Sequence, residues 1–358
     1  MTGIKPGGIA ILSIKEPISH GEYYLELIFR LKGDTNWAKA EREIAFGQIY
    51  LADPKPQSSE ETLPLTNSSP KLNLISPNIL QIVGIETTWD FNVVHGILIS
   101  WKKCGFEIIQ TPPLLDFYRA VTDNDAPSRF GQDWIYNRLH QTQSHIKDVT
   151  WSSSPGQIVV EVTSRIAPPV LEWSVDTVLT YIFTNKQLRI KVKGTPRGNY
   201  LPKTFARIGL TLSLNNMDNA TWFGRGPGES YRDKKLSQKI GQYTLPVDKL
   251  FTNYEYPQET SNRTDVHWVK FSNADFRKPT FKAHFGDLEG ASFTALHYRT
   301  KDLDIAKHPY ELYKLKREET VVRLDWAHHG LGTGSCGPAT LPEYELRSEP
   351  FEYEVLLE

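Results

Sequence analysis

Apolar and polar residues alternate with a period of two along much of the chain. Leucine and phenylalanine occupy alternate positions through 25–31, and isoleucine, leucine and valine do so through 158–162 and 208–214. An alternation of this kind gives a strand one apolar and one polar face, so these runs predict β-strands. Helical spacing is found over 128–142 and in a short turn at 302–307. The pattern therefore predicts an all-β fold, mostly antiparallel, with long loops between the strands.

Composition divides the chain at one segment. Residues 52–72 are rich in proline, serine and other polar residues, as expected of a linker. Residues 1–51 have room for about four short strands, whereas an immunoglobulin-like sandwich has roughly seven, so we predict a partial Ig-like β-sandwich domain there. Residues 73–358 are long enough to close a core of their own, and we expect one large antiparallel β-sandwich.

The overall composition narrows the classes of partner. The 358 residues carry a formal net charge of -1, which gives no field to attract nucleic acid or an anionic membrane. Two cysteines, Cys104 and Cys336, are too few for a disulfide scaffold and fit a reducing compartment. The first residues lack the apolar core of a secretory signal, and no apolar run has the length of a membrane span. We therefore expect a cytoplasmic protein that binds neither nucleic acid nor membrane.

The segment 222–234 has the composition of a rigid turn. Two glycines and a proline surround Arg225 in it. Glycine reaches backbone angles that are closed to other residues, and proline fixes φ, so we expect a tight turn where a strand ends. Arg225 is predicted to be structural, and the carboxylates of Glu229 and Asp233 can accept its hydrogen bonds.

Two further segments gather polar groups. In 256–268, Arg263 and Asp265 stand among amide, acid and hydroxyl side chains, which predicts an ion network that orders a turn. In 116–125, the run Asp-Asn-Asp at 123–125 could bind a cation through oxygen. The same run is common in turns, and we favour that interpretation.

Residues 328–344 contain four glycines within eight positions, too many for a regular strand. They predict a loop, and loops of this kind often carry function. His328, His329 and Cys336 suggest zinc, but adjacent histidines point apart and no fourth ligand is evident. Cys336 also lacks a recognised spacing to a histidine base. We therefore predict neither a metal site nor a catalytic residue in this loop.

Taken in order, these segments resemble the C-terminal part of the glycoside hydrolase family 2 β-galactosidases. That family carries the strings F-x-R-A-x-T-D-N-D, W-F-G-R-G-P-x-E-x-Y-x-D and Y-x-x-P-Q-E-x-G-N-R-T-D-x-R-W. This chain has similar strings at 117–125, 222–233 and 254–268, with Ser261 in place of glycine and His267 in place of the last arginine. Residues 29–48 resemble the second half of the family's Ig-like domain. The resemblance implies a galactose-mutarotase-like supersandwich for 73–358, the small-chain domain, and the chain looks fungal-like.

The resemblance also implies a use for the glycine-rich loop. In the family this loop reaches out of the C-terminal domain toward the mouth of the active site. Bacterial members typically place there a tryptophan that stacks on the sugar, whereas this chain has Cys336, as some fungal lactases do. The implied substrate-binding residues are Gly334, Ser335, Cys336 and His329.

The catalytic groups of the family lie elsewhere. Both catalytic glutamates sit on a barrel that precedes the Ig-like domain, and the magnesium and sodium sites lie mainly on other domains. Within this chain we therefore expect no catalytic residue, no cofactor and no hydrolysis by the chain alone. The implied partners are a large chain or barrel domain, or further copies of the chain, with a galactoside such as lactose as substrate. Two alternatives are a free-standing carbohydrate-binding or structural module, and an inactive truncated gene product.

Overall fold

The computed structural model describes residues 23–51, 69–126, 130–286 and 289–358. The chain divides into two compact units, residues 1–63 and 64–358, and the division falls within the predicted linker. In the first unit, β1 (Tyr23–Arg30) pairs with β2 (Glu43–Leu51) in an antiparallel hairpin. The other strands expected before residue 23 lie outside the described residues.

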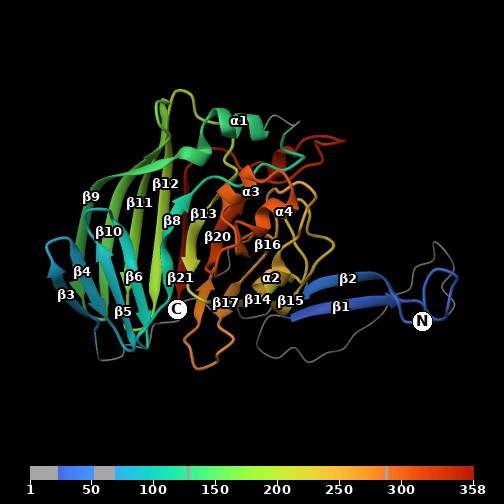
Figure 1. The fold of residues 1–358 in the computed structure, drawn as a ribbon, viewed down its shortest axis with the longest axis horizontal. Helices are drawn as coiled ribbons and strands as arrows, with labels where there is room; N and C mark the ends of the chain where they lie inside the picture. Colours follow the sequence, from blue (N-terminus) through green and yellow to red (C-terminus); the bar gives the residue numbers. More distant parts are fainter. Residues whose placement is uncertain (1–22, 52–68, 127–129, 287–288) are drawn as a thin grey trace. The chain divides into compact units, whose positions relative to one another are not determined.

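The second unit contains three antiparallel sheets (Figure 1). The largest runs in the spatial order β15 (Lys239–Pro246), β14 (Asn219–Gly226), β17 (Trp268–Ser272), β18 (Phe281–His284), β21 (Phe351–Leu357), β12 (Leu188–Gly198), β11 (Trp173–Phe183), β10 (Gln157–Ala167) and β9 (Gln143–Ser154). A second sheet has the order β16 (Arg263–Thr264), β19 (Ser292–Leu296), β20 (Thr320–His328), β13 (Arg207–Leu214) and β8 (Ile109–Asp116). The third is a meander of β3 (Lys71–Ser76), β4 (Ile79–Val83), β5 (Thr87–Asn92), β6 (Ile97–Lys103) and β7 (Phe106–Glu107).

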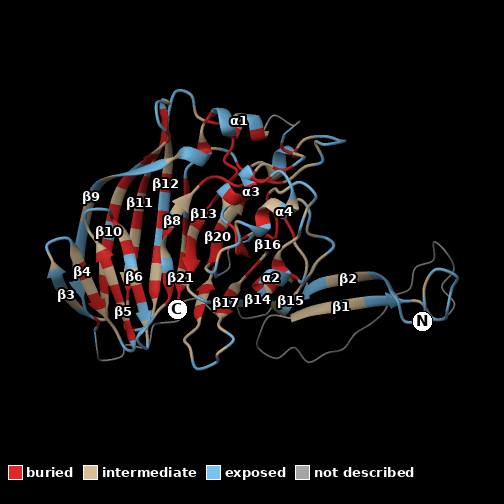
Figure 2. Ribbon diagram, in the orientation of Figure 1, coloured by how far each residue is buried: buried red, intermediate tan, exposed pale blue. Residues whose placement is uncertain are grey.

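The core lies between the largest sheet and the two smaller ones. Figure 2 shows buried residues concentrated along the central strands, and β13 and β20 are buried on both faces. Aromatic pairs join the layers: the Trp89 and Phe183 ring centroids lie 5.4 Å apart, and those of Trp222 and Phe293 lie 5.6 Å apart. Aromatic pairs of this geometry add stabilisation beyond the apolar area that they bury. The predicted all-β sandwich is confirmed.

Short helices occupy the connections between strands. They are α1 (Phe130–Tyr136), α2 (Val247–Leu250), α3 (Thr300–Ile305), α4 (Pro309–Tyr313) and two 3-10 turns, η1 (Leu139–Gln141) and η2 (Pro342–Tyr344). The helix predicted over 128–142 is broken between α1 and η1, because Arg138 adopts a left-handed φ of 54°. The turn predicted at 302–307 belongs to α3. Strand β3 begins at Lys71, within the last two residues of the predicted linker.

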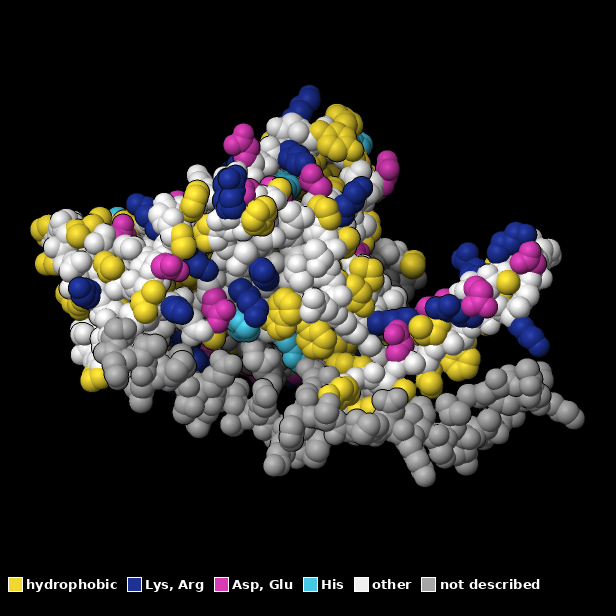
Figure 3. All heavy atoms as spheres, turned by 90° about the horizontal axis from the view of Figure 1, so that it is seen from below, with side chains coloured by type: hydrophobic (Ala, Val, Ile, Leu, Met, Phe, Trp, Pro, Cys, Tyr) yellow, Lys and Arg dark blue, Asp and Glu magenta, His cyan; other side chains and the backbone are white. Residues whose placement is uncertain are grey.

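The surface of the described chain has no dominant sign of charge on the face drawn in Figure 3, where acidic and basic side chains lie interspersed. Several large apolar side chains are exposed on the hairpin of the first unit, among them Phe29 and Ile49. No helix among the described residues is long and apolar enough to cross a membrane.

Candidate functional site

The glycine-rich loop, residues 330–340, follows strand β20 and is held at its base by Asp233. The Asp233 carboxylate accepts hydrogen bonds from the backbone N–H groups of Leu331 at 3.0 Å and Gly332 at 2.7 Å. A Cβ at Gly330 would lie 2.9 Å from the Asp233 carboxyl carbon and 2.9 Å from a Thr340 methyl group. Glycine is therefore required at position 330 for Asp233 to come this close. The segment 222–234, predicted as a turn, begins on strand β14, which ends at Gly226, and its last residues meet the loop through Asp233.

The tip of the loop is held by Asn124. Its Oδ1 accepts hydrogen bonds from the backbone N–H of Ser335 at 3.1 Å and from the Ser335 hydroxyl at 2.7 Å. Its Nδ2 donates to the Gly332 carbonyl at 3.0 Å. Within the loop, the N–H groups of Cys336 and Gly337 donate to the Thr333 carbonyl. The result is a fixed turn that exposes the side chains of Ser335 and Cys336.

His329 lies beneath the loop and away from its tip. Its ring is fully buried, 4.6 Å from Phe130 and 5.3 Å from Trp134, and its Nδ1 accepts a hydrogen bond from the backbone N–H of Leu346 at 3.1 Å. Burial lowers the pKa of His329 to about 3, so the imidazole is neutral. The structure therefore brings Gly334, Ser335 and Cys336 together at the tip and leaves His329 as a core residue at the end of β20.

The segments 116–125 and 254–268 meet beside the loop. The Gln258 side-chain amide donates to the Asp123 carboxylate at 3.0 Å, and the Asp123 backbone N–H donates back to Gln258 Oε1 at 3.1 Å. Asp125, two residues further, forms a buried pair with Arg119 at 2.7 Å. Asn124 thus stands between two neighbours whose side chains are fixed. The run 123–125 serves as a turn that joins its own segment, 116–125, to the segment 254–268 and to the glycine-rich loop.

Glu229 and Arg263 tie the segment 222–234 to the segment 254–268. The Glu229 carboxylate accepts the backbone N–H of Ser261 at 2.9 Å and the hydroxyl of Tyr254. Arg263 donates to the Pro227 carbonyl at 3.0 Å. Ser261 has φ of 71°, in the left-handed region that favours glycine, which fits the glycine in the family string that this segment resembles.

Arg225 has a different partner from the one predicted. Its guanidinium pairs with Asp265 at 2.5 Å and donates to the carbonyl groups of Lys235 and Gln238. The prediction that Glu229 and Asp233 accept its hydrogen bonds is wrong, because both carboxylates turn toward other segments. Arg225 and Asp265 are each about four-fifths buried, so the expected half-buried ion network exists with another acid in it.

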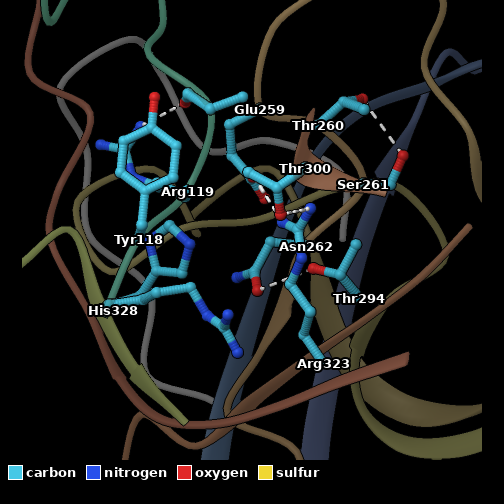
Figure 4. Close-up of polar contacts among 12 residues, drawn as sticks. Tyr118, Arg119, Glu259, Thr260, Ser261, Asn262, Thr294, Thr300, Arg323 and His328 are labelled. Atoms are coloured by element: carbon cyan, nitrogen blue, oxygen red, sulfur yellow. Dashed lines mark hydrogen bonds and ion pairs between the residues drawn. The ribbon is translucent and has the colours of Figure 1, made fainter. Parts of the chain in front are cut away.

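Beneath these segments lies a row of buried ion pairs that the sequence reasoning missed. Figure 4 shows Arg323 extending from its strand to Glu259 and Thr300. The Arg323–Glu259 distance is 2.5 Å, and both side chains are at most 2% exposed. Arg207 pairs with Asp325 in the same way. An arginine within an apolar strand, such as Arg323 in Thr320–His328, is the sequence signal that could have indicated these pairs. A charge at a core position needs a partner of opposite charge.

Four segments far apart in the sequence therefore meet in one place and hold an exposed turn. The carboxylates that lie here either accept hydrogen bonds, as in Glu229 and Asp233, or pair with arginine, as in Asp125 and Glu259. Such bound carboxylates suit a positioning role. The geometry is that of a rigid scaffold for a surface loop.

Comparison with known protein families covers the segments that form this site. Residues 83–357 match the family model of the β-galactosidase small chain, and residues 1–52 match that of β-galactosidase domain 4. The chain belongs to the β-galactosidase small-chain family, and the resemblance described from the sequence is confirmed.

Individual relatives are longer proteins. The chain is 34% identical over 340 residues to the β-galactosidase of Kluyveromyces lactis, a match that covers 90% of this chain and 31% of that protein. It is 27% identical over 357 residues to the β-galactosidase of Priestia megaterium, covering 97% of this chain and 33% of that protein. The chain thus spans about one third of the length of these relatives. The match to the structure of a galactose mutarotase-like protein from Lactobacillus casei covers 78% of this chain and 99% of that structure. Its TM-score is 0.43 at 10% sequence identity.

Proposed function

We propose that these residues work as the C-terminal, small-chain part of a β-galactosidase that hydrolyses terminal β-D-galactosides such as lactose. The observation that carries the proposal is the glycine-rich loop, whose tip presents Ser335 and Cys336 on a turn fixed by Asn124 and Asp233. A loop held in this way can form part of the rim of a sugar site. The match to one third of much longer β-galactosidases favours this function over a free-standing carbohydrate-binding module.

In this proposal the reacting carboxylates come from outside residues 1–358. Retaining hydrolysis needs two carboxyl groups about 5–5.5 Å apart, one of them free to protonate the leaving group. Near the loop, Glu259 and Asp125 are instead paired with arginines, and Asp233 accepts two backbone hydrogen bonds. A barrel domain, on the same longer chain or on a separate one, supplies the pair. We keep the cytoplasm as the expected location and the absence of a cofactor within this chain as a prediction.

A reconstitution tests the function. Residues 1–358 would be joined to, and separately co-expressed with, the part of the Kluyveromyces lactis enzyme that the chain does not cover, and assembly would be followed by co-purification. We expect no hydrolysis of a chromogenic β-galactoside by the chain alone and measurable hydrolysis by the assembly. Turnover by the chain alone that disappears when an acid within 1–358 is replaced would refute the proposal, as would an assembled but inactive complex.

The role of Cys336 is tested in the same assembly. Cys336→Trp adds a flat stacking face worth about 0.5–1.5 kcal/mol, so KM for the galactoside should shift by roughly two- to twelvefold. Cys336→Ser should change KM and kcat little, because we assign the thiol no nucleophilic role. Complete loss of turnover in Cys336→Ser would show that the thiol is chemical. Unaltered KM values in both variants would show that the loop is remote from the sugar.

A further inference from the structure

The side chain of Asn124 bridges two points of the glycine-rich loop that are three residues apart. Its Oδ1 accepts from the Ser335 backbone N–H at 3.1 Å and from the Ser335 hydroxyl at 2.7 Å, while its Nδ2 donates to the Gly332 carbonyl at 3.0 Å. A backbone N–H must donate and a carbonyl must accept, so these contacts fix which end of the amide is which. Both ends of the side chain are therefore used in holding the loop.

The loop has little else to fix its tip. Asp233 holds Leu331 and Gly332 at the base, and the contacts beyond them close the turn on itself through Thr333. Glycine at 332, 334 and 337 gives this stretch wide backbone freedom, and Gly332 already has φ of 64°. The direction in which Cys336 points therefore depends on the anchor at Ser335.

Asn124 is itself well placed to act as an anchor. The preceding residue is bound to Gln258 by the reciprocal pair at 3.1 and 3.0 Å. The following residue, Asp125, is almost fully buried and pairs with Arg119, which is fully buried. Asn124 therefore projects from a rigid corner, and a rigid support with a hydrogen-bonded contact is what positions a functional side chain.

We propose that Asn124 is a positioning residue of the galactoside site, which sets the place of Ser335 and Cys336 at the rim. This role rests on the proposed function. Asn124 acts through the loop and does not touch the sugar itself. Its loss should weaken substrate binding while leaving the chemical step of the assembled enzyme nearly unchanged.

The first arm of the test uses the full chain without any partner. Amide exchange measured by NMR should quicken at Ser335 by about fivefold in Asn124→Ala, the ratio that one net hydrogen bond supports. Exchange at Leu331, whose N–H is held by Asp233, should not change. Asn124→Asp keeps the acceptor for Ser335 but loses the donor to the Gly332 carbonyl, so exchange at Ser335 should quicken less than in Asn124→Ala. Unchanged exchange at Ser335 in Asn124→Ala would overturn the proposal.

A matched control comes from a turn in the third sheet. Asn92 Oδ1 also accepts two hydrogen bonds, from the backbone N–H groups of Val94 and His95, each at 3.0 Å. Asn92→Ala therefore removes similar contacts from a turn that is not part of the loop or its supports. It should leave both Ser335 exchange and galactoside KM at wild-type values.

The second arm measures kinetics in the assembled enzyme. Asn124→Ala should raise KM by roughly two- to twelvefold, because the free loop would have to be ordered when substrate binds, and kcat should stay within about twofold of wild type. The change in KM caused by Cys336→Trp should shrink in the Asn124→Ala background. If the wild-type assembly is active and Asn124→Ala leaves KM unchanged, the role of Asn124 is refuted and the proposed function stands. An inactive wild-type assembly overturns the proposed function and this role with it.

Discussion

The buried pair between Arg323 and Glu259 gives the sharpest test of how the site is supported. Replacing Arg323 by methionine keeps an unbranched apolar stem at this position and removes the guanidinium and its charge. Glu259 is 2% exposed and would be left in the core without its arginine, whose nitrogen lies 2.5 Å from the carboxylate. Breaking a buried pair from one side costs about 3–5 kcal/mol, because the remaining charge is uncompensated.

The expected fall in melting temperature follows from the size of the unit. Residues 64–358 form one compact unit of about 300 residues, for which unfolding entropy near 2.1 cal/mol/K per residue gives roughly 0.6 kcal/mol/K. A loss of about 3–5 kcal/mol then corresponds to a decrease of roughly 5–8 °C. Differential scanning calorimetry of the chain would measure it.

An exposed arginine provides the control. Arg165 pairs with Asp176 at 2.8 Å, but its side chain is 47% exposed. Arg165→Met should cost less than about 1 kcal/mol, and the melting temperature should fall by less than about 2 °C. The double variant Arg323→Met/Glu259→Leu should recover much of the loss, since apolar replacement of both partners of a buried pair is often neutral or stabilising. An Arg323→Met protein that melts like the control, or a double variant no more stable than the single one, would refute this reasoning.

Two other predictions concern residues that the sequence singled out. Arg225→Ala should cost about 1–3 kcal/mol, less than a fully buried pair, because Asp265 keeps Lys235 at 3.2 Å; an unchanged melting temperature would exclude a structural role. His329→Asn keeps an acceptor for the Leu346 N–H but does not titrate. Burial lowers the pKa of His329 to about 3, against about 6.5 in the unfolded chain. Between these values the unfolded state alone binds the proton, so wild type should lose about 1.4 kcal/mol per pH unit relative to the variant as pH falls below 6.5. Urea unfolding of both proteins at pH 7.5, 5.5 and 4.5 would measure this difference, and a pH-independent difference would contradict it.

Local pattern was enough to predict the strands, and the motif strings carried the resemblance to the family. The period-two alternation at 158–162 and 208–214 corresponds to β10 and β13, because the direction of a side chain on a strand depends on its immediate neighbours. The glycine and proline positions at 222–234 predicted a turn, but β14 runs to Gly226, so Arg225 lies on the end of a strand and the chain turns only after it. The helix over 128–142 was overestimated, since its break depends on the left-handed backbone of Arg138.

The partners of the polar residues were decided by tertiary structure. Arg225 pairs with Asp265, forty positions away, and Asp233 with the loop at 331–332, nearly a hundred positions away. Sequence proximity favoured Glu229 and Asp233 as acceptors for Arg225, but hydrogen bonding depends on distance in space. His329 likewise lies in the loop motif by sequence and in the core by structure.

The sequence by itself determined the all-β architecture, because alternation acts over a few residues, and its motif strings carried the resemblance to the family. Which of the polar motifs touch, and which side chain holds the exposed loop, was decided when the sheets packed and brought four distant segments together. Asn124 looks like an ordinary turn residue in the sequence and becomes an anchor through contacts with residues more than two hundred positions away. Local chemistry specified each segment, and the packing of the sheets assigned the partners.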